Sequence, residues 1–116
     1  MINHIFYSVL GSGVWKTYDQ ITEKEFETCI NTNARGLLTA AQLICPKMEK
    51  NGGGVVGITG ATASWRGKPF TAAFAAGKSA QRMLSQSLGI SKFIHFMFIY
   101  CSVLWYTLLL SKLDMQ

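Results

Sequence analysis

A few positions in this sequence combine a reactive side chain with a spacing that chemistry could use. Asn33 interrupts an apolar stripe of helical spacing, between Ile30 and Leu37. A buried amide without partners costs roughly 1–3 kcal/mol, so Asn33 must bond to local backbone, to a buried water, or to a functional group. Lys78 follows Phe74 by four residues, which places both on one helix face. Spacing alone favours a surface lysine whose charged end reaches solvent.

The segment GATAS at residues 60–64 is a further candidate, because it follows a short apolar run at residues 55–59. Such a run is typical of a strand buried on both faces of a parallel sheet. Ligands of open parallel sheets bind outside the carboxyl ends of the strands, although a flexible turn is the simpler interpretation. The glycines at 60 and 67 do not have the spacing of a phosphate loop, so we reject that interpretation.

The cysteines argue against a metal site or a disulfide framework. Cys29, Cys45 and Cys101 are odd in number and have neither CxxC nor histidine spacing. Cys29 and Cys45 fall on one predicted helix, too far apart along its axis to form a bridge. Free thiols fit a reducing compartment, and the first residues do not resemble a secretory signal. We therefore expect a cytosol-facing chain without a metal ion.

Charge is unevenly distributed along the chain. Residues 1–50 have five basic and five acidic side chains, whereas residues 51–116 have six basic and one acidic. The basic residues are scattered singly, and a nucleic-acid surface would need them clustered on one face. Anionic lipids or a phosphorylated cofactor would account for the excess equally well. The apolar content of 49% against 15% charged residues excludes intrinsic disorder.

The first elements that must position these residues are a strand and a long helix. Residues 2–10 predict a short strand. Thr22 and Glu25 form a capping box that opens the helix. Its apolar positions recur at steps of three, four or seven residues: Phe26, Ile30, Leu37, Ala41, Ile44 and Met48. Pro46 should kink or end the last turn, before the glycine-rich turn at 51–54.

The remaining elements alternate between strand and helix. Residues 55–59 predict a strand, residues 60–70 a loop, and residues 71–88 a second helix rich in small side chains. Helix, buried strand and helix in short succession favour an α/β layered fold over a helical bundle.

Residues 19–89 resemble the short-chain dehydrogenase/reductase superfamily. The resemblance rests on the Asn-x-x-Gly of Asn33 and Gly36, on the glycine-rich turn with its following strand, and on the aromatic-x-x-x-Lys of Phe74 and Lys78. It implies a Rossmann-type parallel sheet flanked by helices, binding NAD(H) or NADP(H). In that family a Tyr is the general acid/base, a Ser orients the carbonyl, a Lys binds the nicotinamide ribose and lowers the Tyr pKa, and an Asn holds a water.

By this resemblance, Lys78 and Asn33 match the family's Lys and Asn and are the expected catalytic and cofactor-binding residues. The Tyr position is Phe74 and the Ser position is Ala61. Phenylalanine has no proton to exchange, which removes the general acid/base. We therefore expect the chain to be inactive.

Nothing nearby restores the missing groups. Thr62 and Ser64 could offer a displaced hydroxyl, but neither replaces a phenol with a tuned pKa. The family's Thr-Gly-x-x-x-Gly-x-Gly cofactor fingerprint is missing, so most dinucleotide affinity should be lost. The Asn-Asn-Ala-Gly segment and the later Pro-Gly loop are not recognisable either. The sequence thus predicts an incomplete Rossmann-like domain over residues 1–89 and an apolar tail over 90–116, as an alternative transcript or a gene-model fragment would produce.

The apolar tail has two interpretations. Residues 93–111 carry no formal charge and are bracketed by Lys92 and Lys112. As a helix they would span roughly 28 Å, close to a bilayer core of about 30 Å. The alternative is a buried strand over residues 93–99. The length of the run favours a membrane span over 93–110, because strands rarely exceed about ten residues.

Two functional hypotheses follow from the resemblance and the tail. The first is an NAD- or NADP-dependent oxidoreductase fold acting on a carbonyl or alcohol, inactive in this chain. The alternative is a non-enzymatic interaction protein anchored in a membrane by its tail. In both, the resemblance implies a homodimer through the two helices, with Ala72, Ala73, Ala76 and Ala80 allowing close approach. We expect no nucleic-acid partner.

Overall fold

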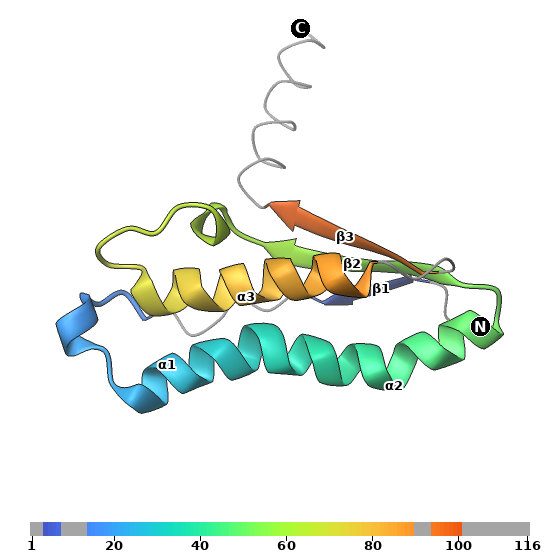
Figure 1. Ribbon diagram of the computed structural model, residues 1–116, viewed down its shortest axis with the longest axis horizontal. Helices are drawn as coiled ribbons and strands as arrows, with labels where there is room; N and C mark the ends of the chain where they lie inside the picture. Colours follow the sequence, from blue (N-terminus) through green and yellow to red (C-terminus); the bar gives the residue numbers. More distant parts are fainter. Residues whose placement is uncertain (1–3, 8–13, 90–93, 101–116) are drawn as a thin grey trace, which may run out of the picture.

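A computed structural model describes residues 4–7, 14–89 and 94–100 of the 116-residue chain. Figure 1 shows a parallel sheet with its helices packed against it. Strands β1 (His4–Tyr7), β2 (Gly54–Gly60) and β3 (Ile94–Tyr100) lie in the order β1-β2-β3. Both pairings are parallel, so the described sheet has the expected α/β topology.

The long helical region begins at the predicted cap. Helix α1 (Glu23–Ile30) starts after Thr22, whose hydroxyl accepts from the Glu25 N–H while Glu25 accepts from the Thr22 N–H, both at 3.1 Å. The capping box is therefore confirmed. Beyond α1 the chain forms one π-helical turn, η2 (Asn31–Arg35), and then helix α2 (Gly36–Lys50). The sequence predicted one continuous α-helix and missed this turn.

Of the two outcomes that the sequence predicted for Pro46, a kink or the end of the last turn, the structure excludes the end. The helix continues through Pro46 to Lys50. Proline removes one N–H donor, and so close to the carboxyl end this loss does not stop the remaining turn. The chain reverses instead at Gly52 and Gly53, whose φ angles of 95° and 101° are open to glycine at little cost.

The core lies between β2 and the helices. Leu37 and Met48 of α2 and Val56 and Ile58 of β2 form a buried cluster. Partly buried side chains from α2 and from α3 (Ala72–Leu88) pack against it: Ile44, Cys45, Leu84 and Leu88. The sequence predicted that β2 is buried on both faces. In the structure one face is only partly buried, because Val55 and Thr59 remain partly exposed. Within the described residues, the packed apolar side chains of β2 are those facing the helices.

The start of the apolar tail is a strand. Residues Ile94–Tyr100 form β3, paired in parallel with all of β2 from Gly54↔Ile94 to Gly60↔Tyr100. The preferred interpretation, one membrane-spanning helix over 93–110, is therefore wrong for residues 94–100, which supply backbone partners to the edge of β2. Among the described segments, no helix has the length and hydropathy that crossing a bilayer would require. Residues 101–116 lie outside the described part.

Candidate active site

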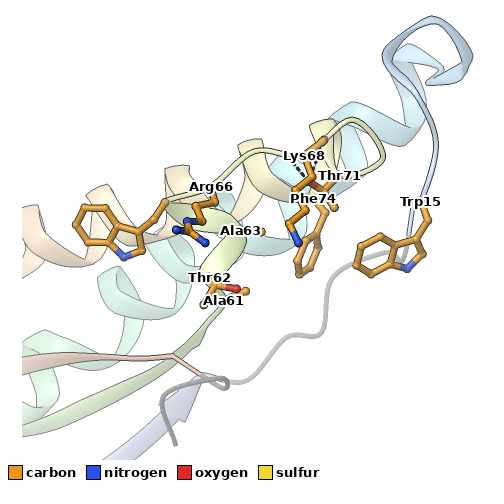
Figure 2. Close-up of a pocket in the computed structure, with 9 residues that line it drawn as sticks. Trp15, Ala61, Thr62, Ala63, Arg66, Lys68, Thr71 and Phe74 are labelled. Atoms are coloured by element: carbon orange, nitrogen blue, oxygen red, sulfur yellow. Dashed lines mark hydrogen bonds between the residues drawn. The ribbon is translucent and has the colours of Figure 1, made fainter. Parts of the chain in front are cut away.

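The carboxyl end of β2 opens into a cavity of about 450 Å³. Strand β2 ends at Gly60, and the chain enters a short 3₁₀ turn, η3 (Thr62–Ser64), before the loop that leads to α3. Figure 2 shows the residues that line the cavity: Trp15, Ala61, Thr62, Ala63, Trp65, Arg66, Lys68, Thr71 and Phe74. The volume lies within the range of small-molecule sites. The position matches the ligand side of an open parallel sheet.

Ala61 and Phe74 line the same cavity. Ala61 follows the last residue of β2, and Phe74 stands in the first turn of α3. The two sequence positions expected to carry the Ser and Tyr hydroxyls are thus brought together, and they present a methyl group and a phenyl ring. In the cavity they form an apolar surface without a proton to donate.

Trp15 lies beside Phe74 in the cavity lining, and its neighbour Lys16 holds it in place. The Trp15 and Phe74 ring centroids are 5.6 Å apart, a distance typical of a favourable aromatic pair. Lys16 forms a parallel β-bridge with Thr71, and its amino group lies 2.6 Å from Glu25 Oε1. The hydrogen bond from Lys16 is the main cause that lowers the pKa of Glu25. Helix α1 therefore fixes the segment that carries Trp15.

Lys78 is buried, contrary to the interpretation as a surface lysine. Its side chain is 2% exposed and donates to Thr59 O at 3.2 Å and to Gln81 Oε1 at 3.4 Å. The amino nitrogen lies 5.9 Å from the centroid of the Phe74 ring, at the limit of a cation–π contact. Through these hydrogen bonds, the ammonium group links the end of β2 to α3 near the Phe74 ring.

Asn33 lies in the π-helical turn and is fully buried. Its Nδ2 donates to Cys29 O at 2.8 Å, so the amide bonds to local backbone, one of the alternatives left open by the sequence. Its Oδ1 has no hydrogen-bond partner among the described residues. A π-turn of this kind is frequent at functional sites. A buried acceptor without a partner is costly, so this oxygen is a candidate to bind a donor such as water.

Gly77 brings α3 against this turn. A Cβ atom on Gly77 would lie 2.8 Å from Cys29 O and 2.9 Å from Asn33 Nδ2. Asn33 therefore sits beside the residue that precedes Lys78, although it does not line the cavity. No sequence pattern pointed to Gly77, and Asn33 and Lys78 were linked only through the family resemblance.

The two nearby hydroxyl groups differ in access. Thr62 lines the cavity, whereas Ser64 does not, being only 4% exposed. Trp15, Arg66 and Lys68 also line the cavity, although no sequence pattern pointed to them. Arg66 and Lys68 flank Gly67, one of the two glycines whose spacing does not fit a phosphate loop.

A dinucleotide does not fit the described residues as they stand. The resemblance assigns the nicotinamide ribose to Lys78, but its amino group donates to Thr59 O and Gln81 inside the protein. The glycine-rich turn of the described part, at Gly52 and Gly53, precedes β2 and so lies at the other end of that strand from the cavity. No phosphate-binding turn is present beside the cavity in residues 14–89.

Comparison with known proteins extends the resemblance at both ends. The family model for short chain dehydrogenase matches residues 5–95. The human protein described as putative dehydrogenase/reductase SDR family member 4-like 1 is 30% identical over 76 residues, which are 66% of this chain and 27% of that protein.

Solved structures agree with this fold. A short-chain dehydrogenase from Rhodopseudomonas palustris matches with a TM-score of 0.79 at 27% identity, over 84% of this chain and 47% of its own. An alcohol dehydrogenase from Thermococcus sibiricus complexed with 5-hydroxy-NADP matches at 0.77 and 21% identity, over 84% and 41%. A 7α-hydroxysteroid dehydrogenase complexed with NADH and 7-oxo glycochenodeoxycholic acid matches at 0.73 and 25% identity, over 85% and 39%.

This chain spans less than half the length of each of these proteins. Two of them were solved with a nicotinamide nucleotide or its derivative. The family match, the parallel sheet and the placement of residues 61, 74 and 78 at one end of that sheet agree with each other. The chain belongs to the short-chain dehydrogenase family.

Proposed function

We propose that this protein binds a ligand in the cavity at the end of β2 without reducing it. The observation that best supports the proposal is the pairing of Ala61 with Phe74 on the cavity wall. By the family resemblance these positions would carry the two hydroxyl groups that touch a carbonyl. A phenyl ring cannot donate or accept the proton that accompanies hydride transfer.

The surroundings of Phe74 support the same proposal. Lys78 would lower the pKa of a phenol at position 74, but here its ammonium group faces a ring without a hydroxyl. Thr62 is the cavity-lining residue next to Ala61 that carries a hydroxyl, and an aliphatic hydroxyl is far less acidic than a phenol. We propose that NADH and NADPH bind weakly, because the described part provides no turn to hold their phosphates.

A turnover assay of the full chain tests this proposal. We expect no oxidation of NADH or NADPH above background with a panel of ketones, and no reverse reaction with secondary alcohols. A catalytic short-chain dehydrogenase in parallel controls for the assay. Lys78→Met keeps the buried volume of Lys78 and removes its charge. Turnover by the wild type that Lys78→Met abolishes would show that the site is an active oxidoreductase.

Small, partly exposed side chains on the outer side of α3 support a second proposed function, association with another copy of this chain. Ala72, Ala76 and Ala80 are partly exposed at a spacing of four residues, and Met83 continues the stripe with 51% exposure. Ala73 is fully buried inside the fold and so is not available to a partner, contrary to the sequence expectation. We propose a two-fold homodimer that packs α3 against its symmetry mate.

We also propose that the protein resides in the cytosol, with attachment to a membrane through residues after β3 as the alternative. In the described part, Cys45 forms no disulfide, which supports a reducing compartment. Fractionation of cells that express the full chain separates the two, since resistance to carbonate extraction would show membrane attachment.

A further inference from the structure

We infer that the cavity selects a small organic anion, a molecule with a flat apolar body and one carboxylate or phosphate group. The inference rests on the proposed function, because it names the ligand class of the same cavity. It comes from the chemistry of the lining, which includes a basic part, Arg66 and Lys68, and an aromatic part, Trp15 and Phe74 (Figure 2).

The basic part consists of Arg66 and Lys68. No Asp or Glu is among the residues that line the cavity. Within the described segments, Lys16 and Glu25 form an ion pair. Glu25 therefore neutralises Lys16 and does not neutralise Arg66 or Lys68. Two positive charges therefore face a space to which the described residues supply no counter-charge. An anionic group entering this space would gain charge-assisted hydrogen bonds, and a cation would be repelled.

The backbone that carries these cations is fixed before a ligand arrives. The Arg66 N–H donates to Thr62 O at 3.1 Å. The Lys68 N–H donates to Thr71 Oγ1 at 3.0 Å, and the Thr71 N–H returns a bond to Lys68 O at 3.0 Å. Thr71 itself is 7% exposed. The ligand must order only the two side-chain ends, which lowers the entropic cost of binding.

The aromatic part is fixed as well. Trp15 lies beside Phe74, and the Lys16–Glu25 ion pair and the Lys16–Thr71 bridge hold the segment that carries it. Ala61 completes the apolar surface. A flat ring packed here would bury its faces against carbon, while an attached anionic group reaches Arg66 or Lys68. The cavity of about 450 Å³ has room for a ligand of two fused rings.

Matched probes test the inference in the absence of any nucleotide. Titration calorimetry of the full chain compares 2-naphthoate, 2-naphthyl phosphate, neutral 2-naphthamide and the cation 2-naphthylmethylammonium. We expect at least one anion to bind about tenfold more tightly than the amide, since a charge-assisted hydrogen bond contributes roughly 1.5–3 kcal/mol. The cation should bind most weakly. The carboxylate and phosphate arms assign the anionic group.

Charge-neutral variants locate the site. Arg66→Gln combined with Lys68→Gln should abolish the preference for anions over the amide. Lys47→Gln combined with Lys50→Gln is the matched control, because it removes the same charge from exposed positions near the end of α2. The control should keep the preference. Circular dichroism verifies that both double variants fold.

Several results would overturn the inference: binding of no probe at millimolar concentration, equal affinity for anion and amide, or an anion preference that survives loss of Arg66 and Lys68. These outcomes leave the proposed absence of turnover intact. Conversely, reduction of a ketone in the assay described above would refute the proposed function while the anion preference could still be measured here.

Discussion

At Gly77 the backbone of α3 passes so close to the π-helical turn that a side chain would not fit. The nearest atoms to an added Cβ are the carbonyl oxygen of Cys29 and the amide nitrogen of Asn33, which are hydrogen-bonded to each other. Neither atom can move without breaking that bond or shifting α1. The fit of α3 against α1 and η2 therefore depends on this single missing methyl group.

We expect Gly77→Ala to destabilise the protein by about 1–2 kcal/mol. Overpacking costs roughly 1–3 kcal/mol, and the better helix propensity of alanine offsets up to about 1 kcal/mol. Urea denaturation of both proteins measures the difference. Gly67→Ala is the matched control, since an added Cβ there meets nothing within 4 Å. Equal stability of Gly77→Ala and the wild type would show that the helices can separate at little cost.

Single residues were predictable from the sequence to different degrees. The burial of Asn33 followed from its place on an apolar stripe, and the structure confirms it. The burial of Lys78 did not follow from spacing, because one of its partners, Thr59, lies in β2, 19 residues earlier in the chain. No sequence pattern pointed to Arg66 and Lys68, because both lie in a loop and only the fold places that loop beside the cavity.

Among the secondary-structure elements, the start of α1 is the one that side-chain hydrogen bonds define most clearly. Thr22 and Glu25 exchange two hydrogen bonds, and Glu25 is also bound by Lys16, which belongs to the segment carrying Trp15. The cap therefore stabilises the helix and one wall of the cavity together.

Thr22→Ala should lower the free energy of unfolding by about 1 kcal/mol, because the Glu25 N–H loses its acceptor. Thr28→Ala serves as the control: its hydroxyl bonds to Lys24 O within the helix, an interaction that does not add to helix stability. Thermal unfolding followed by circular dichroism compares the variants. A loss for Thr28→Ala as large as that for Thr22→Ala would show that the capping box contributes nothing of its own.

Most elements could be located from local patterns. The starts of α1 and α3 and the extent of β2 agree with the sequence to within a residue. The π-turn could not be found, because the stripe steps by seven residues from Ile30 to Leu37 and this gap conceals the extra residue of the turn. The sequence favoured a membrane span over the strand β3, because hydropathy alone does not show that the backbone of β2 needs a hydrogen-bonding partner.

For the whole molecule, the proposed dimer is the feature to test first. Replacement of Ala76 and Ala80 by arginine should convert a dimer into a monomer at tens of micromolar, because two charged side chains cannot pack at a close helix contact. Light scattering reports the mass directly. Ser87→Arg adds charge at an exposed position beyond the stripe and should leave the dimer intact. A monomeric wild type would refute the proposal.

The parallel pairing of the strands also determines the order in which the chain can assemble. His4 pairs with Val55, and Gly54 with Ile94, so every rung of the sheet joins residues far apart in sequence. Loop closure makes such contacts slow, whereas the helices need only local ones. We expect helical structure to form first during refolding and the cavity, which requires the end of β2, to form last. With Trp105 replaced by phenylalanine, the fluorescence of Trp15 and Trp65 should lag behind far-ultraviolet circular dichroism; simultaneous changes would show that sheet and helices fold in one step.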